Sequence, residues 1–260
     1  MTYLPHFEVD GLSVQYDEAV VLDQVRLSAQ GGSLIGLIGP NGAGKTTLIK
    51  AMAGLLPGTT GTLSLDSTSL DSWRQDTLAQ KIGYLSQSRT VYWPVTVDRL
   101  VSLGRLPHRG PWDGVSVTDQ VAIDGALALT DTTSIRHRTV TTLSGGELAR
   151  VLLARVLAGG PEVILADEPV SGLDPGHRLQ VLNGLKNLSE SGRLVVVVLH
   201  DLTLASRFCD RLVLLHKGRV EADGVPKDVL NSETLAKVYG VEAVTVSQGD
   251  ETAVLPWSHL

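Results

Sequence analysis

Residues 34–46 read LIGLIGPNGAGKT and are the most informative segment of this chain. The first five residues are nearly all apolar, which is typical of a central strand covered on both faces. The next eight fit the pattern G-x-x-x-x-G-K-[ST] without a mismatch, and a helix is expected from Lys45 onward. The glycines allow successive N–H groups to turn inward, and the helix N-terminus adds partial positive charge. The segment predicts a nucleotide phosphate site, although glycine-rich turns also join strands to helices without a ligand.

Strands and helices alternate downstream of this segment. Two further apolar runs, at residues 163–166 and 195–199, resemble the first. Helical patterns lie at residues 46–53, 148–157 and 178–188. Because parallel strands are joined by crossover helices, this order predicts an α/β fold with a mainly parallel, doubly wound sheet.

Other parts of the chain follow different patterns. The first thirty residues alternate between apolar and polar, which predicts N-terminal antiparallel β strands with one solvated face. Residues 73–142 begin loop-rich and lead to a helix capped by Ser116 or Thr118, which indicates an inserted helical lobe. Residues 211–215 and 219–222 predict a hairpin.

The expected organisation is a single domain over residues 1–260. Its length, its 43% hydrophobic content and its 19% charged content suit one folded core with a smaller lobe. We expect residues 1–86 and 160–240 to form a nucleotide-binding core and residues 87–159 the lobe. Residues 241–260 form a C-terminal tail whose sequence gives no clear structural prediction.

Composition excludes several classes of protein. Lys and Arg number 22 against 28 Asp and Glu, giving −6, so binding of bulk nucleic acid is not expected. The single cysteine, Cys209, excludes a disulfide framework and is expected to pack as a small hydrophobe. The longest aliphatic run, Leu194 to Leu199, is far shorter than the roughly 20 residues of a spanning helix. The first ten residues show no secretory signal, so we expect a cytoplasmic protein. If the protein works at a membrane, another subunit must hold it there.

Four residues are expected to carry phosphate chemistry. Lys45 would meet the β- and γ-phosphates, and the Thr46 hydroxyl would ligate Mg²⁺. Asp167 ends the second apolar run, where it would hold the metal through water, and Glu168 would orient the attacking water or accept its proton. The alternative is that this acidic pair only caps a strand in solvent.

Two further features lie near these residues. His200 follows the third apolar run, so we expect it at the same sheet edge and in contact with the γ-phosphate; the alternative is a structural histidine. Leu143-Ser144-Gly145-Gly146-Glu147 comes directly before a helical pattern and predicts a second anion-binding turn.

With these motifs, the sequence resembles the nucleotide-binding subunit of ATP-binding cassette (ABC) transporters, from about Tyr3 to about Tyr239. The resemblance implies a P-loop NTPase core and two such domains that close head-to-tail around two ATP molecules. It implies that Tyr16 stacks on adenine, the alternative being an ordinary strand aromatic, and that Gln87 touches Mg²⁺ or the attacking water. It also implies that Ser144, Gly145 and Gly146, which we call the signature turn, act with Asp174 on the ATP of the opposite subunit.

The predicted site residues fall into three groups. The catalytic group is Lys45, Gln87, Glu168 and His200, and the magnesium group is Thr46, Gln87 and Asp167. The nucleotide group is Tyr16, Gly39, Pro40, Asn41, Gly42, Ala43, Gly44, Lys45, Thr46, Thr47, Ser144, Gly145, Gly146 and Asp174.

The lobe sequence resembles one group within the family. Pro94-Val95-Thr96-Val97 and Leu103-Gly104-Arg105-Leu106-Pro107-His108 are similar to segments in importers of iron–siderophore, haem or cobalamin; the alternative is a plain helix end and turn. Leu148-Ala149 and Ala166 depart from the commonest family pattern, so a metal ion or another small solute stays open as substrate.

The partners implied by the resemblance are integral membrane permease subunits, a second copy of the chain and, indirectly, a solute-binding protein, but no nucleic acid. It places the protein peripherally on the cytoplasmic face of the cell membrane. The competing hypotheses are an ABC ATPase of DNA repair or translation, and a nucleotide-regulated scaffold that does not hydrolyse ATP.

Overall fold

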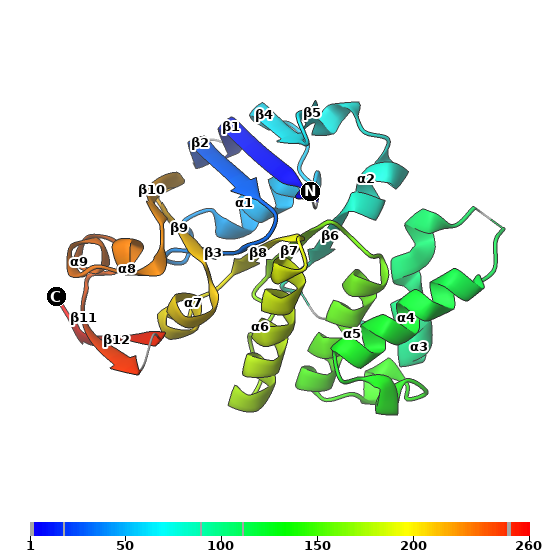
Figure 1. Cartoon of the computed structure of the whole chain (residues 1–260). Helices are drawn as coiled ribbons and strands as arrows, with labels where there is room; N and C mark the ends of the chain where they lie inside the picture. The colour runs from blue at the N-terminus through cyan, green and yellow to red at the C-terminus, as the bar shows by residue number, and fades with distance from the viewer. Residues whose placement is uncertain (1–2, 18, 89, 111, 249–250) are drawn as a thin grey trace.

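The computed structural model describes residues 3–17, 19–88, 90–110, 112–248 and 251–260. The outer limit of the expected domain, at residues 1–2, and part of the expected tail, at residues 249–250, lie outside these residues. The described chain forms stacked layers, with an upper antiparallel sheet, a central sheet and a group of helices below it (Figure 1).

The central sheet has the strand order β10-β9-β3-β8-β7-β6. Each pair of adjacent strands from β9 through β3, β8 and β7 to β6 is parallel. The edge strand β10 instead forms an antiparallel hairpin with β9. This bears out the predicted mainly parallel α/β fold and the predicted hairpin. The strands are β3 (Leu34–Ile38), β6 (Ile82–Leu85), β7 (Val163–Asp167), β8 (Leu194–Val198), β9 (Arg211–His216) and β10 (Arg219–Gly224).

Both faces of the central sheet are covered, which explains its continuous apolar strands. In β8, Val195 and Val197 pack into the core on one face, while Val196 and Val198 pack into the core on the other. The first face is covered by α5 (Gly145–Ala158), α6 (Pro175–Glu190) and α7 (Leu202–Phe208), and the second by α1 (Lys45–Met52). Cys209 is buried and unpaired, as expected, and burial raises the pKa of its thiol to about 12.

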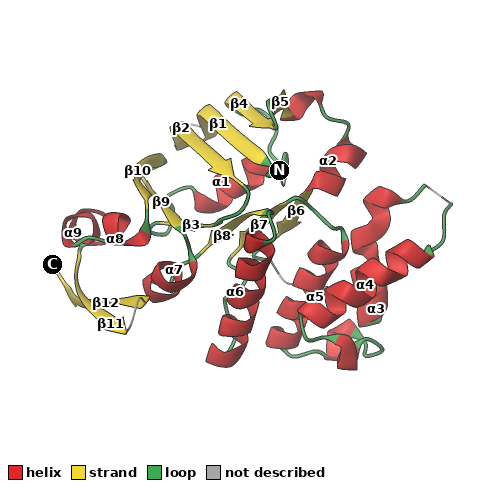
Figure 2. Cartoon of the chain, in the orientation of Figure 1, coloured by secondary structure: helices red, strands yellow, loops and turns green. Residues whose placement is uncertain are grey.

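The N-terminal strands form the separate antiparallel sheet β2-β1-β4-β5. Their inward residues pack onto α1, so this helix lies between two sheets (Figure 2). The first two strands were predicted, whereas the short and polar β4 and β5 were not. The bounds are β1 (His6–Tyr16), β2 (Ala19–Gln30), β4 (Thr60–Leu65) and β5 (Thr68–Ser69).

The helical lobe lies to one side of the sheets, where α5 packs against α3 and α4 (Figure 1). Ser116, not Thr118, caps α4, through a reciprocal capping box with Asp119. The segments that lead into the lobe or belong to it are η1 (Leu70–Ser72), α2 (Gln75–Lys81), α3 (Val97–Ser102), η2 (Leu103–His108), α4 (Val117–Leu129), η3 (Thr133–Ile135) and η4 (Val140–Thr142).

The C-terminal tail forms a second hairpin, which was not predicted. It packs on α7, where the Thr203 hydroxyl donates a 2.9 Å hydrogen bond to the Val254 carbonyl. Val254 is buried in the core, so the tail is part of the folded unit. The last elements are α8 (Pro226–Val229), α9 (Ser232–Tyr239), β11 (Val241–Gln248) and β12 (Glu251–His259).

Candidate nucleotide-binding site

The loop between β3 and α1 has the backbone that its glycines predict. Gly39, Gly42 and Gly44 have φ values of 146°, 77° and 100°. A Cβ atom at Gly39 would lie 2.2 Å from the Leu215 carbonyl oxygen, and one at Gly44 would lie 2.5 Å from a Leu22 methyl carbon. Larger residues are therefore excluded at both positions, and the loop N–H groups can face an anion at the start of α1.

Lys45 folds back over this loop. Its ammonium group donates to the Gly39 carbonyl at 2.8 Å and to the Pro40 carbonyl at 2.9 Å. Only 7% of the residue is exposed, and burial lowers the pKa of its ammonium group, against the opposing effects of Glu168 and Asp167. Two hydrogen bonds thus hold the side chain at the phosphate-binding loop.

A groove of about 270 Å³ opens beside the loop. It brings together residues 41–47 of the loop and the start of α1 with four residues from other parts of the sequence, whereas Gly39 and Pro40 are not in its lining. Its lining residues are Val21, Asn41, Gly42, Ala43, Gly44, Lys45, Thr46, Thr47, Gln87, Glu168 and His200. Val21 was not predicted, because nothing in an ordinary strand valine signals a ligand.

Gln87, Glu168 and His200 meet at one carboxylate oxygen. The Gln87 amide donates to Glu168 Oε1 at 2.8 Å, and His200 Nε2 donates to the same oxygen at 2.6 Å. The three residues follow β6, β7 and β8, which are neighbours in the sheet, so their carboxyl ends meet at one edge. Glu168 also has a φ of 51°, a strained value for a side-chain-bearing residue that is typical of functional sites.

Asp167 is a buried carboxylate, with 1% of the residue exposed. Within the described residues, neither of its oxygens accepts a hydrogen bond of normal geometry. Burial raises the pKa of Asp167, while the Thr46 side chain opposes the rise. Two unsatisfied oxygens beside a hydroxyl are a donor set that suits a hard cation, so the residues present fit Mg²⁺.

The described residues contain no metal site made of His, Cys, Asp and Glu side chains alone. Among the described residues, no group of three or more His, Cys, Asp and Glu side chains is placed to hold a metal ion. Mg²⁺ is commonly bound through one or two protein groups together with substrate phosphates. Asp167 and Thr46 therefore match a metal that arrives with a nucleotide.

The signature turn lies outside this groove. Ser144 caps α5 through a reciprocal capping box with Glu147, leaving Gly145 and Gly146 on the first turn. A Cβ atom at Gly145 would meet nothing within 4 Å. Among the described residues, the turn's three members are absent from the groove lining, so the structure does not bring them to the loop of their own chain.

Asp174 and Tyr16 are also outside the groove lining of the described chain. Asp174 caps α6 by accepting a 3.1 Å hydrogen bond from the His177 N–H. Tyr16 is half exposed at the end of β1, where it pairs with Ala19, two residues before the groove residue Val21. The predicted contact between Tyr16 and adenine stays a prediction.

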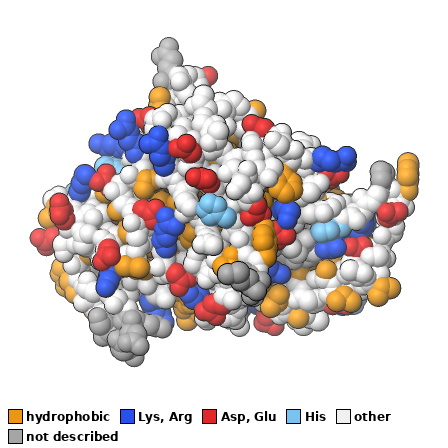
Figure 3. Space-filling model, turned by 45° about the horizontal axis from the view of Figure 1, so that its top comes forward, with side chains coloured by type: hydrophobic (Ala, Val, Ile, Leu, Met, Phe, Trp, Pro, Cys, Tyr) orange, Lys and Arg blue, Asp and Glu red, His pale blue; other side chains and the backbone are white. Residues whose placement is uncertain are grey.

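Charged side chains are interspersed on the face shown in Figure 3, where red and blue groups do not separate into single-sign fields over the described residues. With a net charge of −6, the chain offers no global positive field to a polyanion. Among the described residues, no helix combines the length and apolar character needed to cross a membrane.

Together, the loop, the carboxylates and the sheet edge define a nucleoside triphosphatase of the phosphate-loop class. Comparison with known proteins narrows this class. The ABC transporter family matches residues 22–171. This chain belongs to the ABC transporter family, as an ATP-binding and ATP-hydrolysing component.

Individual relatives agree with that placement. The chain is 43% identical to the Hemin import ATP-binding protein HmuV of Rhodococcus jostii, over 95% of this chain and 85% of the relative. It is 40% identical to HmuV of Pseudomonas aeruginosa, over 91% and 93%. It is 39% identical to the Cobalamin import ATP-binding protein BtuD of Halobacterium salinarum, over 89% of this chain but 58% of the relative.

Solved structures share the fold. A chain of a metal-chelate type ABC transporter in an inward-facing conformation superposes with a TM-score of 0.83, at 23% identity and 98% coverage of both chains. A dimeric bacterial ABC transporter cassette gives a TM-score of 0.76, at 27% identity over 85% of this chain and 99% of the other. The first of these comparisons supports the fold alone, because its identity is low.

Proposed function

We propose that this chain is the ATPase subunit of an importer for haem or a related iron–siderophore or cobalamin ligand. The ATPase part is carried by one observation, which is the convergence of Gln87 and His200 on Glu168 at the mouth of the phosphate loop. The substrate part is supported by relatives named for hemin and cobalamin import. A different metal ion or small solute is the alternative substrate.

The loop residues bind and orient the triphosphate. Lys45 neutralises charge at the β- and γ-phosphates. The loop and the start of the helix are supplied by Gly39, Pro40, Asn41, Gly42, Ala43, Gly44 and Thr47. Thr46, Asp167 and Gln87 would hold Mg²⁺, which supplies charge neutralisation on the phosphate oxygens. This assignment is supported by the groove lining, which includes residues 41–47 and Gln87, and by Asp167, a buried carboxylate next to the lining residue Glu168.

Glu168 is the residue we assign to the attacking water. Its carboxylate orients that water or accepts its proton, while Gln87 and His200 hold the carboxylate at the groove. His200 also contacts the γ-phosphate in this assignment. Because these groups come from three strands, a small shift of one strand relative to the others alters the catalytic geometry.

Four residues outside the groove are assigned to contact with the ATP of a second copy of the chain. They are Ser144, Gly145, Gly146 and Asp174. Their absence from the groove of the described chain supports this arrangement. A nucleotide that contacts two subunits stabilises the closed dimer, and loss of its γ-phosphate removes part of that stabilisation. Tyr16 is assigned to the adenine of its own chain's ATP.

The lobe, residues 87–159, is the part we assign to permease contact, and residues 1–86 and 160–240 form the nucleotide-binding core. Tyr92 is 84% exposed and Trp93 is 68% exposed, between Gln87 and α3, so two large aromatic side chains are available to a partner. The protein then sits peripherally at the cytoplasmic face of the membrane, bound to integral permease subunits, with a solute-binding protein linked only through them.

The proposal is tested by purification from the native membrane and by reconstitution. We expect Mg²⁺-dependent ATPase activity, co-purification with an integral membrane protein, and stimulation of that complex by haem with its binding protein. Stimulation by cobalamin or a ferric siderophore instead would correct the substrate. ATPase activity without any membrane partner would favour a non-transport ABC ATPase, and absence of hydrolysis would favour a nucleotide-regulated scaffold.

A further inference from the structure

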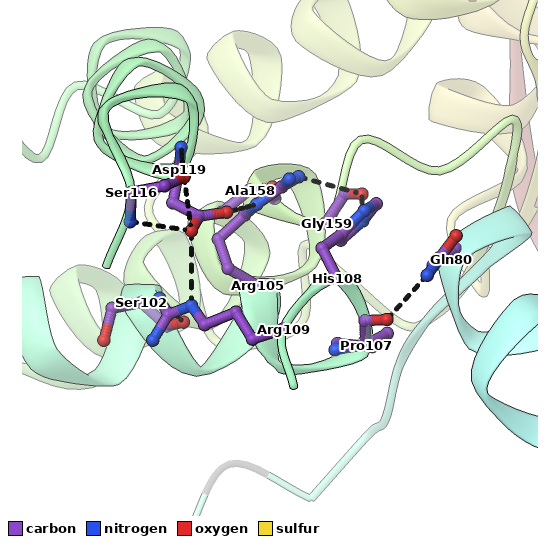
Figure 4. Close-up of polar contacts among 10 residues, drawn as sticks. All are labelled: Gln80, Ser102, Arg105, Pro107, His108, Arg109, Ser116, Asp119, Ala158 and Gly159. Carbon is purple, nitrogen blue, oxygen red and sulfur yellow. Dashed lines mark hydrogen bonds and ion pairs between the residues drawn. The ribbon is translucent and has the colours of Figure 1, made fainter. Parts of the chain in front are cut away.

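The short segment η2 contacts three separate elements of the protein (Figure 4). From α2, the Gln80 amide donates to the Pro107 carbonyl at 2.6 Å. From η2 itself, Arg105 donates to Asp119 on α4 at 2.7 Å and to the Ala158 carbonyl at the end of α5 at 3.0 Å. The segment follows directly on the end of α3 and links it to these three elements.

The contacts to α5 satisfy the end of that helix. The last carbonyls of a helix have no partner within it and carry partial negative charge. Arg105 covers the Ala158 carbonyl, and His108 Nε2 lies 2.8 Å from the Gly159 carbonyl. A carbonyl only accepts, so His108 Nε2 carries the proton in this hydrogen bond. Two side chains of η2 thus cap α5 at its carboxyl end.

The backbones of η2 and α5 are also in close contact. A Cβ atom at Gly104 would lie 2.0 Å from the Arg155 carbonyl oxygen, so only glycine fits at this position. With no side chain between them, the two segments have little freedom to slide against each other. A displacement of η2 is therefore transmitted directly to the last turn of α5.

Arg105 is itself held rigidly. Its ion pair with Asp119 is buried, and Asp119 also accepts hydrogen bonds from the Ser116 backbone and hydroxyl groups, while Arg109 lies 3.5 Å away. The planar guanidinium group presents separate nitrogens to the carboxylate and to the carbonyl, whereas a lysine offers a single nitrogen for both. Arg105 therefore joins α4 to α5.

The other end of α5 carries the signature turn. The helix runs over Gly145–Ala158, about 20 Å at 1.5 Å per residue, with Ser144 as its N-cap. Because α5 packs against α3 and α4 as one rigid element, contacts that hold its carboxyl end also help to fix the position of Gly145 at its amino end.

We propose that Arg105 and His108 are positioning residues that hold the carboxyl end of α5 and so aim the signature turn at a second subunit's ATP. The inference rests on the proposed role of Ser144, Gly145 and Gly146. Gln80 links the same segment to α2, which runs into β6 and then to Gln87. The segment η2 thus sets the position of α5, which carries the signature turn, relative to β6, which leads to Gln87.

The test compares His108→Ala and His108→Gln in the full chain, with His137→Ala as a matched control because His137 is an exposed histidine of the same lobe. We expect His108→Ala to lower kcat about three- to tenfold and to weaken the ATP-dependent dimer of a Glu168→Gln background by a similar factor, the scale of one lost hydrogen bond. Binding of a fluorescent ATP analogue to the monomer should change less than about twofold. Gln restores a donor at similar reach, so it should recover most of the loss.

Arg105→Lys is a second variant, which keeps the charge beside Asp119 and should reduce dimerisation in the same direction. Normal kcat and normal dimerisation in both His108→Ala and Arg105→Lys would overturn the proposal. So would a loss of monomer ATP binding together with a lower melting temperature, because that pattern shows general loosening. If the Glu168→Gln parent itself forms no dimer with ATP, the two-site function fails, and this inference fails with it.

Discussion

Glu168 Oε1 accepts a 2.6 Å hydrogen bond from His200 Nε2, joining the ends of the neighbouring strands β7 and β8 at the nucleotide groove. The two residues are 32 positions apart in the sequence. Their contact is made by the parallel sheet, which brings strand ends to a common edge. The histidine thereby fixes the direction of the carboxylate that we assign to the attacking water.

Glu168→Gln should retain ATP binding and lose hydrolysis. The amide keeps the size of the side chain but cannot accept a proton, so we expect kcat to fall by roughly 10²- to 10⁴-fold. ATP then stays intact and should hold two chains together. Steady-state ATPase assays and gel filtration with ATP measure the two effects. If this variant elutes only as a monomer at saturating ATP, the two-site arrangement is wrong.

His200→Ala should lower kcat more than it changes ATP affinity. The substitution removes the hydrogen bond that orients Glu168 while leaving the loop and Lys45 in place. We expect a kcat reduction of about 10- to 100-fold, smaller than that of Glu168→Gln, because Gln87 still donates to the same oxygen. His216→Ala is the control, because His216 is a half-buried histidine outside the groove lining. Equal effects of the two substitutions would remove the special role of His200.

Lys45→Ala should abolish measurable hydrolysis and weaken ATP binding about 10- to 100-fold, since one charge-assisted contact to phosphate is lost. The substitution also removes two hydrogen bonds to the loop carbonyls, so circular dichroism and melting temperature serve as controls for folding. Isothermal titration with ATP gives the affinity. Near-normal turnover by a folded Lys45→Ala protein would contradict the phosphate-loop assignment.

Local patterns were sufficient for the parts of the fold that depend on neighbouring residues. The runs at β3, β7 and β8 were readable because alternate side chains are buried on opposite faces, leaving no polar position. The loop before Lys45 was readable because its glycines, lysine and threonine act within one turn of helix. These features were enough to predict every groove residue except Val21 and Gln87. Gln87 was predicted from the family resemblance, and Val21 was not predicted.

Long-range contacts could not be read in the same way. The hydrogen bonds of Arg105 and His108 reach Ala158 and Gly159, more than 50 positions away, and nothing in the local turn signals that distance. The tail hairpin was missed because, among its described side chains, only Val254 is fully buried, so β11 and β12 lack a strong apolar period. Tertiary packing supplied what those segments do not encode locally.

Asp119→Asn should destabilise the protein at neutral pH and less so in acid. Hydrogen bonds from Arg105 and from Ser116 hold the pKa of Asp119 well below its usual range. A lowered folded-state pKa stabilises the protein fully above the unfolded-state value of about 3.9, and that stabilisation declines as the pH falls toward the folded-state value. Melting temperatures of the two proteins at pH 7, 5 and 3 should therefore converge toward low pH. A constant difference would show that packing, not charge, sets the effect.

Gly145→Asp should separate the two nucleotide contacts of the chain. A Cβ atom at Gly145 has open space within 4 Å, so the monomer should fold normally and bind ATP with unchanged affinity. In the proposed dimer, the new carboxylate would face the phosphates of the second subunit's ATP, where like charges repel. We expect ATP-dependent dimerisation in the Glu168→Gln background to be lost and kcat in the otherwise normal chain to fall at least tenfold. Gly184→Asp, at another open helical glycine outside the groove lining, is the matched control. Loss of monomer ATP binding in Gly145→Asp alone would show that the signature turn serves the nucleotide of its own chain.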